Sequence, residues 1–483
     1  MDSFGTRKSP YLCRRKQWDD ISRNSVIIMK KRQHLIRLIA AALIGFFTLS
    51  TATAGGLMTN TNYHIAFDRM MARGATFDID AAYSNPAGMA WGHEGWQLSF
   101  NWQNPHQWRD IEAQAPAIGL DQKFKGKASA PFVPGLFASY KHDRWAISAM
   151  LGIVGSGGSV TYDDGIPMFA VPVRAMAAQN GLSPDDYTLD SQVKGKQFVY
   201  GGQLNFTYRL DDHWSVAAGV RANYYDGYNR GHVVATLKAV PIDLINLQLD
   251  ADQRGWGVNP IISVNYRLNK LVLTGRYEFR TKLSIPNDTK TLDAKILNAA
   301  SLATGQPQFL PQEVVMQQFG SQVAAYQDGV RTRYDLPALL SLAAGYEFLP
   351  NLRATVEYHF FDDKNAKMSV TGDRQKALTH GTQEVLAGIE WDINKTFTVS
   401  CGGQRTDYGL SPEYQSNTSF ACDSYSIGLG GAVNINEHLR VNAGYFCSIY
   451  SDNKRETSYM SVPVTETYSR TNNVFGLGID YRF

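Results

Sequence analysis

The sequence lacks the features that mark several large classes of protein. Only four of its 483 residues are cysteines, far too few for a disulfide-stabilised scaffold. Lys and Arg number 47 against 44 Asp and Glu, so the formal net charge of +3 produces no field that would attract nucleic acid. After Gly55 no run of 18 apolar residues occurs, which excludes a membrane-spanning helix there. We therefore expect no nucleic-acid partner, and either a soluble fold or a membrane barrel beyond Gly55.

The first 54 residues have the pattern of an export segment. Residues 1–28 are polar and charged, and we interpret them as an extension that results from a misassigned start codon. Residues 29–54 have a basic start, an apolar stretch and the small-residue cleavage motif Ala52-Thr53-Ala54. The apolar stretch, 38–49, is shorter than the roughly 20 residues that a spanning helix needs. We predict that residues 29–54 are a signal peptide.

The region from Trp96 onward alternates between apolar and polar residues, which is the pattern of a sheet with two different faces. Aromatic residues make up 12% of the chain, which also favours strands. In segments 271–280, 352–360 and 473–483, every charged residue has the parity opposite to that of the apolar face. We expect the apolar face to contact lipid and the charges to face a lumen, where arginines can pair with Glu278 or Glu357.

About 14 strands can be counted, and their connections alternate between brief turns and seven long polar loops. A soluble β-sandwich also alternates in polarity, but it has no reason to place all its long loops at one end. We predict an all-β fold, an antiparallel transmembrane β-barrel of about 14 strands over residues 96–483, in the outer membrane of a Gram-negative bacterium. The strands are expected to begin near Trp96, Phe132, Trp145, Phe198, Trp214, Trp256, Leu271, Leu336, Leu352, Gln383, Thr396, Ala421, Leu439 and Asn473.

The last strand has a further feature at its end. Phe483, with Tyr481 two residues before it, resembles the C-terminal signature by which outer-membrane barrels are recognised for insertion. This resemblance predicts the barrel-assembly machinery as a partner that acts through Phe483. The surrounding outer-membrane lipid is the second partner that a barrel implies.

Residues 55–95 precede the first strand and show neither helical nor strand periodicity. They contain Arg73-Gly74-Ala75, then Asp78-Ile79-Asp80-Ala81-Ala82, then Asn85-Pro86-Ala87-Gly88. This ordered set resembles the N-terminal hatch of the FadL-type long-chain fatty acid transporters. Trp256-Gly257, Tyr277 and Leu336-Pro337 extend the resemblance into the barrel. It implies that residues 55–95 are a hatch inside the lumen, with Asn85, Pro86, Ala87 and Gly88 as part of the plug; a tight turn into the first strand is the other interpretation of these four residues.

The resemblance also implies a kinked third strand that gives a lateral exit to the bilayer. The third strand runs from Trp145 to Ile153 and then meets several glycines. Gly152, Gly155 and Gly157 are therefore candidates for a lateral opening, because glycine permits a bulge or a bend. An ordinary loop start is the alternative.

Candidate ligand-binding residues come from the lumen and from the longest loop. Ile261, Leu339, Leu386 and Phe446 have the inward parity, and they either contact a ligand or pack the hatch against the wall. In loop 285–335, Leu292, Ile296 and Leu297, then Val315, Phe319, Val323 and Tyr326, follow helical spacing and predict two helices that form a ligand groove or pack on each other. Residues 167–178 predict a similar piece. Arg230, Lys364 and Lys367 are candidates for binding a fatty-acid carboxylate.

The predicted function is uptake of long-chain fatty acids or similar hydrophobic small molecules. Aromatic hydrocarbons would need nearly the same apolar pocket, so their transport is one alternative. A haem receptor is another, because histidines such as His232, His359 and His380 can coordinate iron. No nucleophile signature accompanies any histidine, so we expect no enzyme, no cofactor and no metal.

Three cysteines remain after export: Cys401, Cys422 and Cys447. Two interpretations of Cys401 and Cys422 are open, a disulfide bridge between them or a role as small apolar side chains in the packing.

Overall fold

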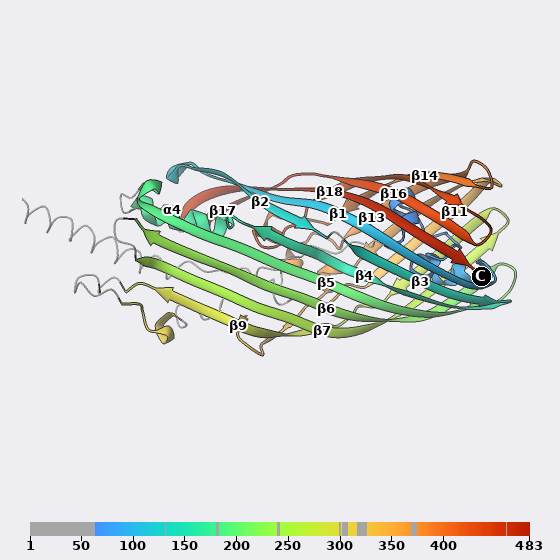
Figure 1. The fold of residues 1–483 in the computed structure, drawn as a ribbon, viewed down its shortest axis with the longest axis horizontal. Coiled ribbons are helices and arrows are strands. Elements are labelled where there is room, and N and C mark those ends of the chain that lie inside the picture. Colours follow the sequence, from blue (N-terminus) through green and yellow to red (C-terminus); the bar gives the residue numbers. More distant parts are fainter. Residues whose placement is uncertain are drawn as a thin grey trace, which may run out of the picture.

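The computed structural model describes residues 63–130, 132–179, 183–238, 242–298, 301, 308–315, 326–368, 374–459 and 461–483. Within these ranges the chain forms a closed antiparallel sheet around a small helical segment (Figure 1). Residues 1–62, which include the predicted extension, signal peptide and start of the hatch, lie outside the described part. No helix of the described residues is long and apolar enough to cross a membrane.

Eighteen strand segments make up the barrel, and four pairs of them run end to end, which leaves 14 barrel strands. The interrupted strands are β2 with β3, β8 with β9, β10 with β11, and β16 with β17, and β1 closes the ring on β18. The predicted fold class and strand number are confirmed. The segments are β1 (Gly95–Ala115), β2 (Leu120–Ser129), β3 (Val133–His142), β4 (Trp145–Tyr162), β5 (Tyr187–Arg209), β6 (Trp214–Leu237), β7 (Asp243–Leu268), β8 (Leu271–Glu278), β9 (Ser284–Ile296), β10 (Arg331–Arg333), β11 (Leu339–Leu349), β12 (Leu352–Phe361), β13 (Gln383–Asp392), β14 (Phe397–Asp407), β15 (Ser424–Asn434), β16 (Leu439–Tyr450), β17 (Asn453–Tyr459) and β18 (Val462–Arg482).

The two ends of the barrel differ in their connections. At one end, which we call the inner end, short turns join β3 to β4, β5 to β6 and β7 to β8, and the C-terminus lies there (Figure 1). At the other, outer end, the long connections and helix α4 (Pro167–Gln179) are found. Strands β5, β6 and β7 have 23, 24 and 26 residues, far more than the roughly 9–11 that cross a bilayer core. The additional residues extend these three strands on the outer side of the barrel.

An apolar band with aromatic edges surrounds the barrel. Along β6 the outward side chains of Trp214, Val216 and Val220 are exposed. Trp214 packs on Tyr266 at the inner edge of the band, with ring centroids 4.6 Å apart, and Tyr224 packs on Trp256 at the outer edge, also 4.6 Å apart. Trp214 and Tyr224 are 10 positions apart, so the band has the height that a tilted strand needs to cross a bilayer core.

The hatch occupies the lumen near the inner end. It contains α2 (Ile65–Met70), α3 (Ala81–Ser84) and the 3-10 helix η1 (Pro86–Trp91). Helix α2 lies on β13 to β16 and β18, and η1 lies on β4 to β7. Glycines on the wall permit this close approach, since a Cβ atom added at Gly388 or Gly402 would overlap the carbonyl oxygen of Met70.

Part of the longest loop differs from its prediction. Leu292 and Ile296 lie in strand β9, which pairs with the outer half of β7, so the helix predicted there is wrong. Every second residue of this part of β9 packs in an apolar cluster: Leu292, Ala294 and Ile296. Leu292 and Ile296 are therefore four positions apart, which is also the distance between residues on one face of a helix. Residues 312–315 are helical, but Phe319 and Val323 lie outside the described residues. Helix α4 confirms the helix predicted at 167–178.

Candidate functional site

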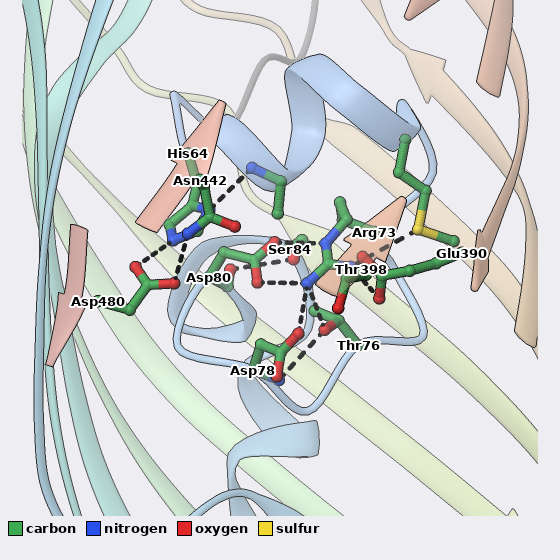
Figure 2. Close-up of polar contacts among 12 residues, drawn as sticks. His64, Arg73, Thr76, Asp78, Asp80, Ser84, Glu390, Thr398, Asn442 and Asp480 are labelled. Atoms are coloured by element: carbon green, nitrogen blue, oxygen red, sulfur yellow. Dashed lines mark hydrogen bonds and ion pairs between the residues drawn. The ribbon is translucent and has the colours of Figure 1, made fainter. Parts of the chain in front are cut away.

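Within the hatch, Arg73 links the motifs that the sequence analysis singled out. Its Nε donates to Asp80 Oδ2 and its Nη2 to Asp80 Oδ1, both at 2.8 Å, and Nη2 also donates to Asp78 Oδ2 at 2.9 Å. Figure 2 shows these contacts gathered around one guanidinium. A bidentate pair of this kind fixes geometry as well as charge. It gives the hatch a defined shape although little of it is regular helix.

A buried ion pair and a buried histidine–aspartate contact hold the hatch to the wall. Arg69 pairs with Glu390 of β13 and donates to Ser400 Oγ at 2.7 Å. His64 Nε2 lies 3.0 Å from Asp480 Oδ1 on β18. Arg69 and Glu390 are both buried, and removal of one partner from such an ion pair typically costs about 3–5 kcal/mol. The hatch is therefore clamped on this side of the lumen.

On the β5 to β7 side, uncharged side chains donate hydrogen bonds to the hatch around Pro86. Thr207 Oγ1 donates to the carbonyl oxygen of Pro86 at 2.8 Å, and Ser215 Oγ donates to that of Ala87 at 2.7 Å. Asn85 accepts from the Gly88 N–H at 3.1 Å and so caps η1. The Asn85-Pro86-Ala87-Gly88 segment thus forms a tight turn, and that turn is also attached to the barrel wall. Its part in transport stays a prediction.

A cavity, which we call the luminal cavity, lies between the hatch and the outer end of the barrel. Phe67 and Met71 of the hatch line it, together with Phe446 and Val474 of the wall, and these four pack in one apolar cluster. Polar side chains line much of the remaining wall. They include Gln103, Gln107, Gln404, Thr406, Ser448 and Asn472. The luminal cavity is therefore amphipathic, with its apolar part at the hatch.

The four apolar lumen candidates differ in position. Phe446 lines the luminal cavity and packs edge-on against Phe67, with centroids 6.5 Å apart. Leu386 is fully buried in the same cluster and packs the hatch to the wall. Leu339 lines a smaller cavity beside Tyr83. Ile261 is buried, and it lines neither the luminal cavity nor the smaller cavity beside Tyr83. The structure thus brings only Phe446 to the luminal cavity.

Strand β4 is irregular where the luminal cavity reaches it. Its register with β5 shifts between Ile153 and Gly155 and again between Ser156 and Gly158, so β4 contains two bulges. On its other side β4 pairs with β3 up to Leu151 and with β2 only from Val160. Among the described residues, β4 positions 152–159 therefore have no ladder partner on that side; we call this the ladder break.

The glycines proposed for a lateral opening lie within the ladder break. Gly155 lines the luminal cavity, as do Ile153 and Val133. Gly152 is in β4 directly after the last β3 pair, and Gly157 is one of the bulged positions. Gly158 has a φ of 77°, which an L-residue rarely adopts. These glycines do not begin a loop, because they lie inside a bulged strand.

The three basic candidates for a carboxylate lie elsewhere. Arg230 has the outward parity of β6 and pairs with Asp250 and Asp252, each at 2.9 Å, so its charge is neutralised. Lys364 is exposed and donates to the Thr379 carbonyl oxygen at 3.4 Å. Lys367 is exposed beyond β12. An apolar groove at the outer end lies beside Arg230 and is lined by Ile166, Phe169, Val193, Val233, Leu249 and Leu292.

The histidines considered for haem lie on separate elements. His359 is buried between Glu357 at 2.9 Å and Glu384 at 3.0 Å, and His232 lies 3.1 Å from Asp190. His380 lies before β13, 3.6 Å from Asp407. The described part of the chain contains no group of three His, Cys, Asp or Glu that could hold a metal ion.

Cys401, Cys422 and Cys447 are all free, so a Cys401–Cys422 bridge is absent. Cys422 packs in an apolar cluster.

Sequence reasoning missed the residues that clamp the hatch, and it missed two arginines near the outer end of the luminal cavity, Arg109 and Arg470. Glu390 could have been noticed as a charge with inward parity on its strand. Its partner Arg69 lies 321 positions earlier in the chain, and no local pattern connects the two. The same holds for Arg109 and Arg470, which only the β1–β18 register brings together.

The geometry defines a closed barrel that is filled by a hatch and has an amphipathic cavity ending at a break in the wall. No protein-family model matches the sequence, and no curated protein matches it either. The structure is similar to that of a Pseudomonas aeruginosa FadL homologue, with a TM-score of 0.60, 15% identity, and 88% of this chain and 99% of the other covered. It is also similar to the P. putida toluene transporter TodX, with a TM-score of 0.53, 13% identity, and 85% and 97% covered. At these identities the likeness shows a shared fold. This fold is the one that the resemblance in the sequence implied.

Proposed function

We propose that this protein takes up hydrophobic small molecules across the outer membrane of a Gram-negative bacterium, through the luminal cavity and out sideways at the ladder break. The observation that carries the proposal is the continuity of the cavity: its lining runs from Phe67 of the hatch to Gly155 of the bulged strand. A molecule in the cavity thus contacts both the plug and the break in the wall.

The position of the ladder break supports a lateral route. Ile153 pairs with Tyr200, and Tyr200 stacks on Tyr224, with ring centroids 6.5 Å apart, in the outer aromatic edge of the apolar band. The break therefore faces the outer edge of the layer that the band fits. Apolar molecules are more stable in such a layer than in water, so a sideways exit needs no passage past the clamped hatch.

Long-chain fatty acids and aromatic hydrocarbons both remain candidate substrates within this proposal. The FadL homologue and the toluene transporter that share the fold are each consistent with hydrophobic cargo. Haem uptake has less support, because His359 is already held by two carboxylates and His232 contacts Asp190. Outer-membrane lipid and, through Phe483, the barrel-assembly machinery are the partners we propose.

The test is to fill the luminal cavity near the ladder break. Val133 is buried and lines the cavity there, so Val133→Trp should reduce saturable uptake of radiolabelled palmitate and of toluene by about tenfold or more. Uptake is measured in cells that lack other transporters for these compounds. Val216 faces outward on β6, and Val216→Trp is the matched control with the same change in size.

Folded protein in the outer membrane is measured for both variants by heat-modifiable migration on gels. Normal uptake by a well-folded Val133→Trp protein would contradict the proposed route. Wild-type protein that accelerates uptake of neither compound would contradict the function itself.

A further inference from the structure

Charged side chains cover the outward face of β5, β6, β7 and β9 beyond the aromatic edge of the apolar band. These four strands lie side by side and extend together to the outer end (Figure 1). We call the charged residues between the aromatic edge and the row of Lys194 the outer charged belt. Its basic members are Lys194, Lys196, Arg230, Arg254 and Lys290, and its acidic members are Asp226, Asp250, Asp252 and Asp288. None of these nine residues lines the luminal cavity.

The register shows how far the outer charged belt lies from the apolar band. Outward from the aromatic pair Tyr224–Trp256, the next β6–β7 pairs are Asp226–Arg254, Tyr228–Asp252 and Arg230–Asp250. Arg254 is two positions beyond Trp256, about 7 Å along the strand, and a headgroup layer is about 5–8 Å deep. Lys194 is six positions beyond Tyr200, which is about 15 Å along the bilayer normal for a strand tilted by about 40°. The belt therefore begins at the level of lipid headgroups and extends beyond it.

Within the outer charged belt, the carboxylates lie beneath the cations. The side chain of Asp252 is 9% exposed, and it lies 2.9 Å from Arg230, 2.8 Å from Lys290 and 3.8 Å from Arg254. Three cations thus share one carboxylate. The side chains of Arg254 and Lys290 are 58% and 52% exposed, so part of their donor capacity faces the surroundings of the barrel. This arrangement presents positive charge outward and suits an anionic ligand.

A shallow depression of about 450 Å³ forms the outer part of the belt. Lys194 and Arg230 line it and are register partners, so two like charges stand next to each other across the strands. Uncharged donors and acceptors complete much of the lining: Gln192, Gln248 and Thr291. Amides and hydroxyls of this kind form hydrogen bonds with sugar hydroxyls. The depression therefore fits a headgroup that has both sugar hydroxyls and anionic groups.

We propose that the outer charged belt binds the headgroup of a phosphorylated glycolipid, with Arg254 and Lys290 at one phosphate and Lys194 at a second anionic group further out. Guanidinium and ammonium groups are the usual phosphate ligands of proteins. Lys194 is four positions beyond Phe198, the β5 residue in the row of Arg254, so the two levels are about 13 Å apart along the strand. A lipid with a single phosphate reaches only the level of Arg254.

The inference rests on the proposed location in the outer membrane, and it adds a lipid site apart from the transport route. A lipid is favoured over a free anion because the belt continues directly into the apolar band. The acyl chains of a lipid gain stability on Val216 and Val220 of that band, which inorganic phosphate does not.

The test measures lipid binding to the purified full-length protein in a neutral detergent by microscale thermophoresis. The ligands are phosphorylated lipopolysaccharide and phosphatidylglycerol, which has one phosphate and no sugar. Lys194→Gln should weaken lipopolysaccharide binding by about threefold and leave phosphatidylglycerol binding unchanged. Lys194→Gln combined with Arg254→Gln should weaken lipopolysaccharide binding by about tenfold, since two exposed charge pairs are lost. The matched control is Lys270→Gln with Lys395→Gln, which removes the same charge from exposed positions at the inner end.

Folding of each variant is checked by heat-modifiable migration. Unchanged lipopolysaccharide binding in the folded double variant would overturn the site, and so would an equal loss in the inner-end control. Equal losses of lipopolysaccharide and phosphatidylglycerol binding in Lys194→Gln would contradict the glycolipid class. Displacement of lipopolysaccharide by inorganic phosphate alone would indicate a site for free anions instead.

Palmitate uptake separates this inference from the proposed function, because the double variant should transport at the wild-type rate. A protein that transports normally but does not bind lipopolysaccharide would contradict only the glycolipid site. Absence of the wild-type protein from the outer-membrane fraction of cells would contradict the proposed location and the glycolipid site together.

Discussion

The barrel wall is built differently at β13 to β18 and at β3 to β4. At β13, β14, β15, β16 and β18 the ladder is continuous from strand to strand, and the hatch is clamped there through Glu390 and Asp480. At β3 and β4 the ladder stops at Leu151 and resumes only at Val160. Both regions line the same luminal cavity.

In the proposed function, this difference separates retention of the hatch from release of the ligand. Segments with few ladder hydrogen bonds open at a lower free energy than those with a complete ladder and buried ion pairs. We therefore expect the wall at β13 to β18 to hold the hatch in place, and the wall at β3 to β4 to open at a lower free energy. Transport by the proposed lateral route needs no expulsion of the hatch.

The largest effect is expected from repairing the ladder break. Deletion of both bulged residues, Val154 and Gly157, restores a regular register and keeps the face of every later β4 residue unchanged. Uptake of labelled palmitate should then fall to the level of cells without the protein, because the exit is closed. Heat-modifiable migration should still show a folded barrel.

Gly157→Ala keeps the bulge and serves as the control for disturbance of β4, so it should retain most of the uptake. If the deletion variant folds and transports at the wild-type rate, the ladder break is not the exit, and the comparison of the two walls loses its functional meaning.

A smaller effect is expected from weakening the clamp. Glu390→Gln leaves Arg69 and Arg353 without the carboxylate that they share, which should lower the free energy of unfolding by about 3–5 kcal/mol. Urea denaturation in detergent, followed by tryptophan fluorescence, measures this change. Single-channel conductance in planar bilayers should rise, since a loosened hatch admits ions.

The control is Glu347→Gln, which changes an exposed glutamate on β11 and should leave both measurements unchanged. Equal stability of Glu390→Gln and the wild-type protein would mean that the hatch is held by other contacts.

Much of the fold could be predicted from the sequence because lipid imposes a strict alternation on the strands that cross it. Phe475, Leu477 and Ile479 are all exposed on β18, as their parity predicted, and Arg276 and Glu278 are buried on β8. The outer extensions were harder to recognise. On β7, Leu244 and Ile245 are both buried although they are neighbours, because protein covers both faces beyond the band.

The site could be predicted only where its parts are close in sequence. Asn85-Pro86-Ala87-Gly88 and the glycines of β4 are local features, and the structure places them in the hatch and at the ladder break. The ion pairs and the Arg109–Arg470 pair depend on register across hundreds of residues. A single sequence carries no signal for such register. It therefore does not show that Arg230, a candidate for binding a carboxylate, pairs with Asp250 and Asp252 of the neighbouring strand.

The smallest effect is expected at the turn that begins η1. Asn85→Ala removes the cap of η1 and the donation to Asn265 Oδ1 at 3.1 Å, but that acceptor keeps a bond from Thr274 Oγ1 at 3.1 Å. Loss of the cap should lower the free energy of unfolding by about 1 kcal/mol, measured by the same urea denaturation. Since the ion pairs on the other wall remain, palmitate uptake should stay within about twofold of the wild-type rate. A well-folded Asn85→Ala protein that no longer transports would show that this turn takes part in transport, and that the hatch moves on the side that faces β5 to β7.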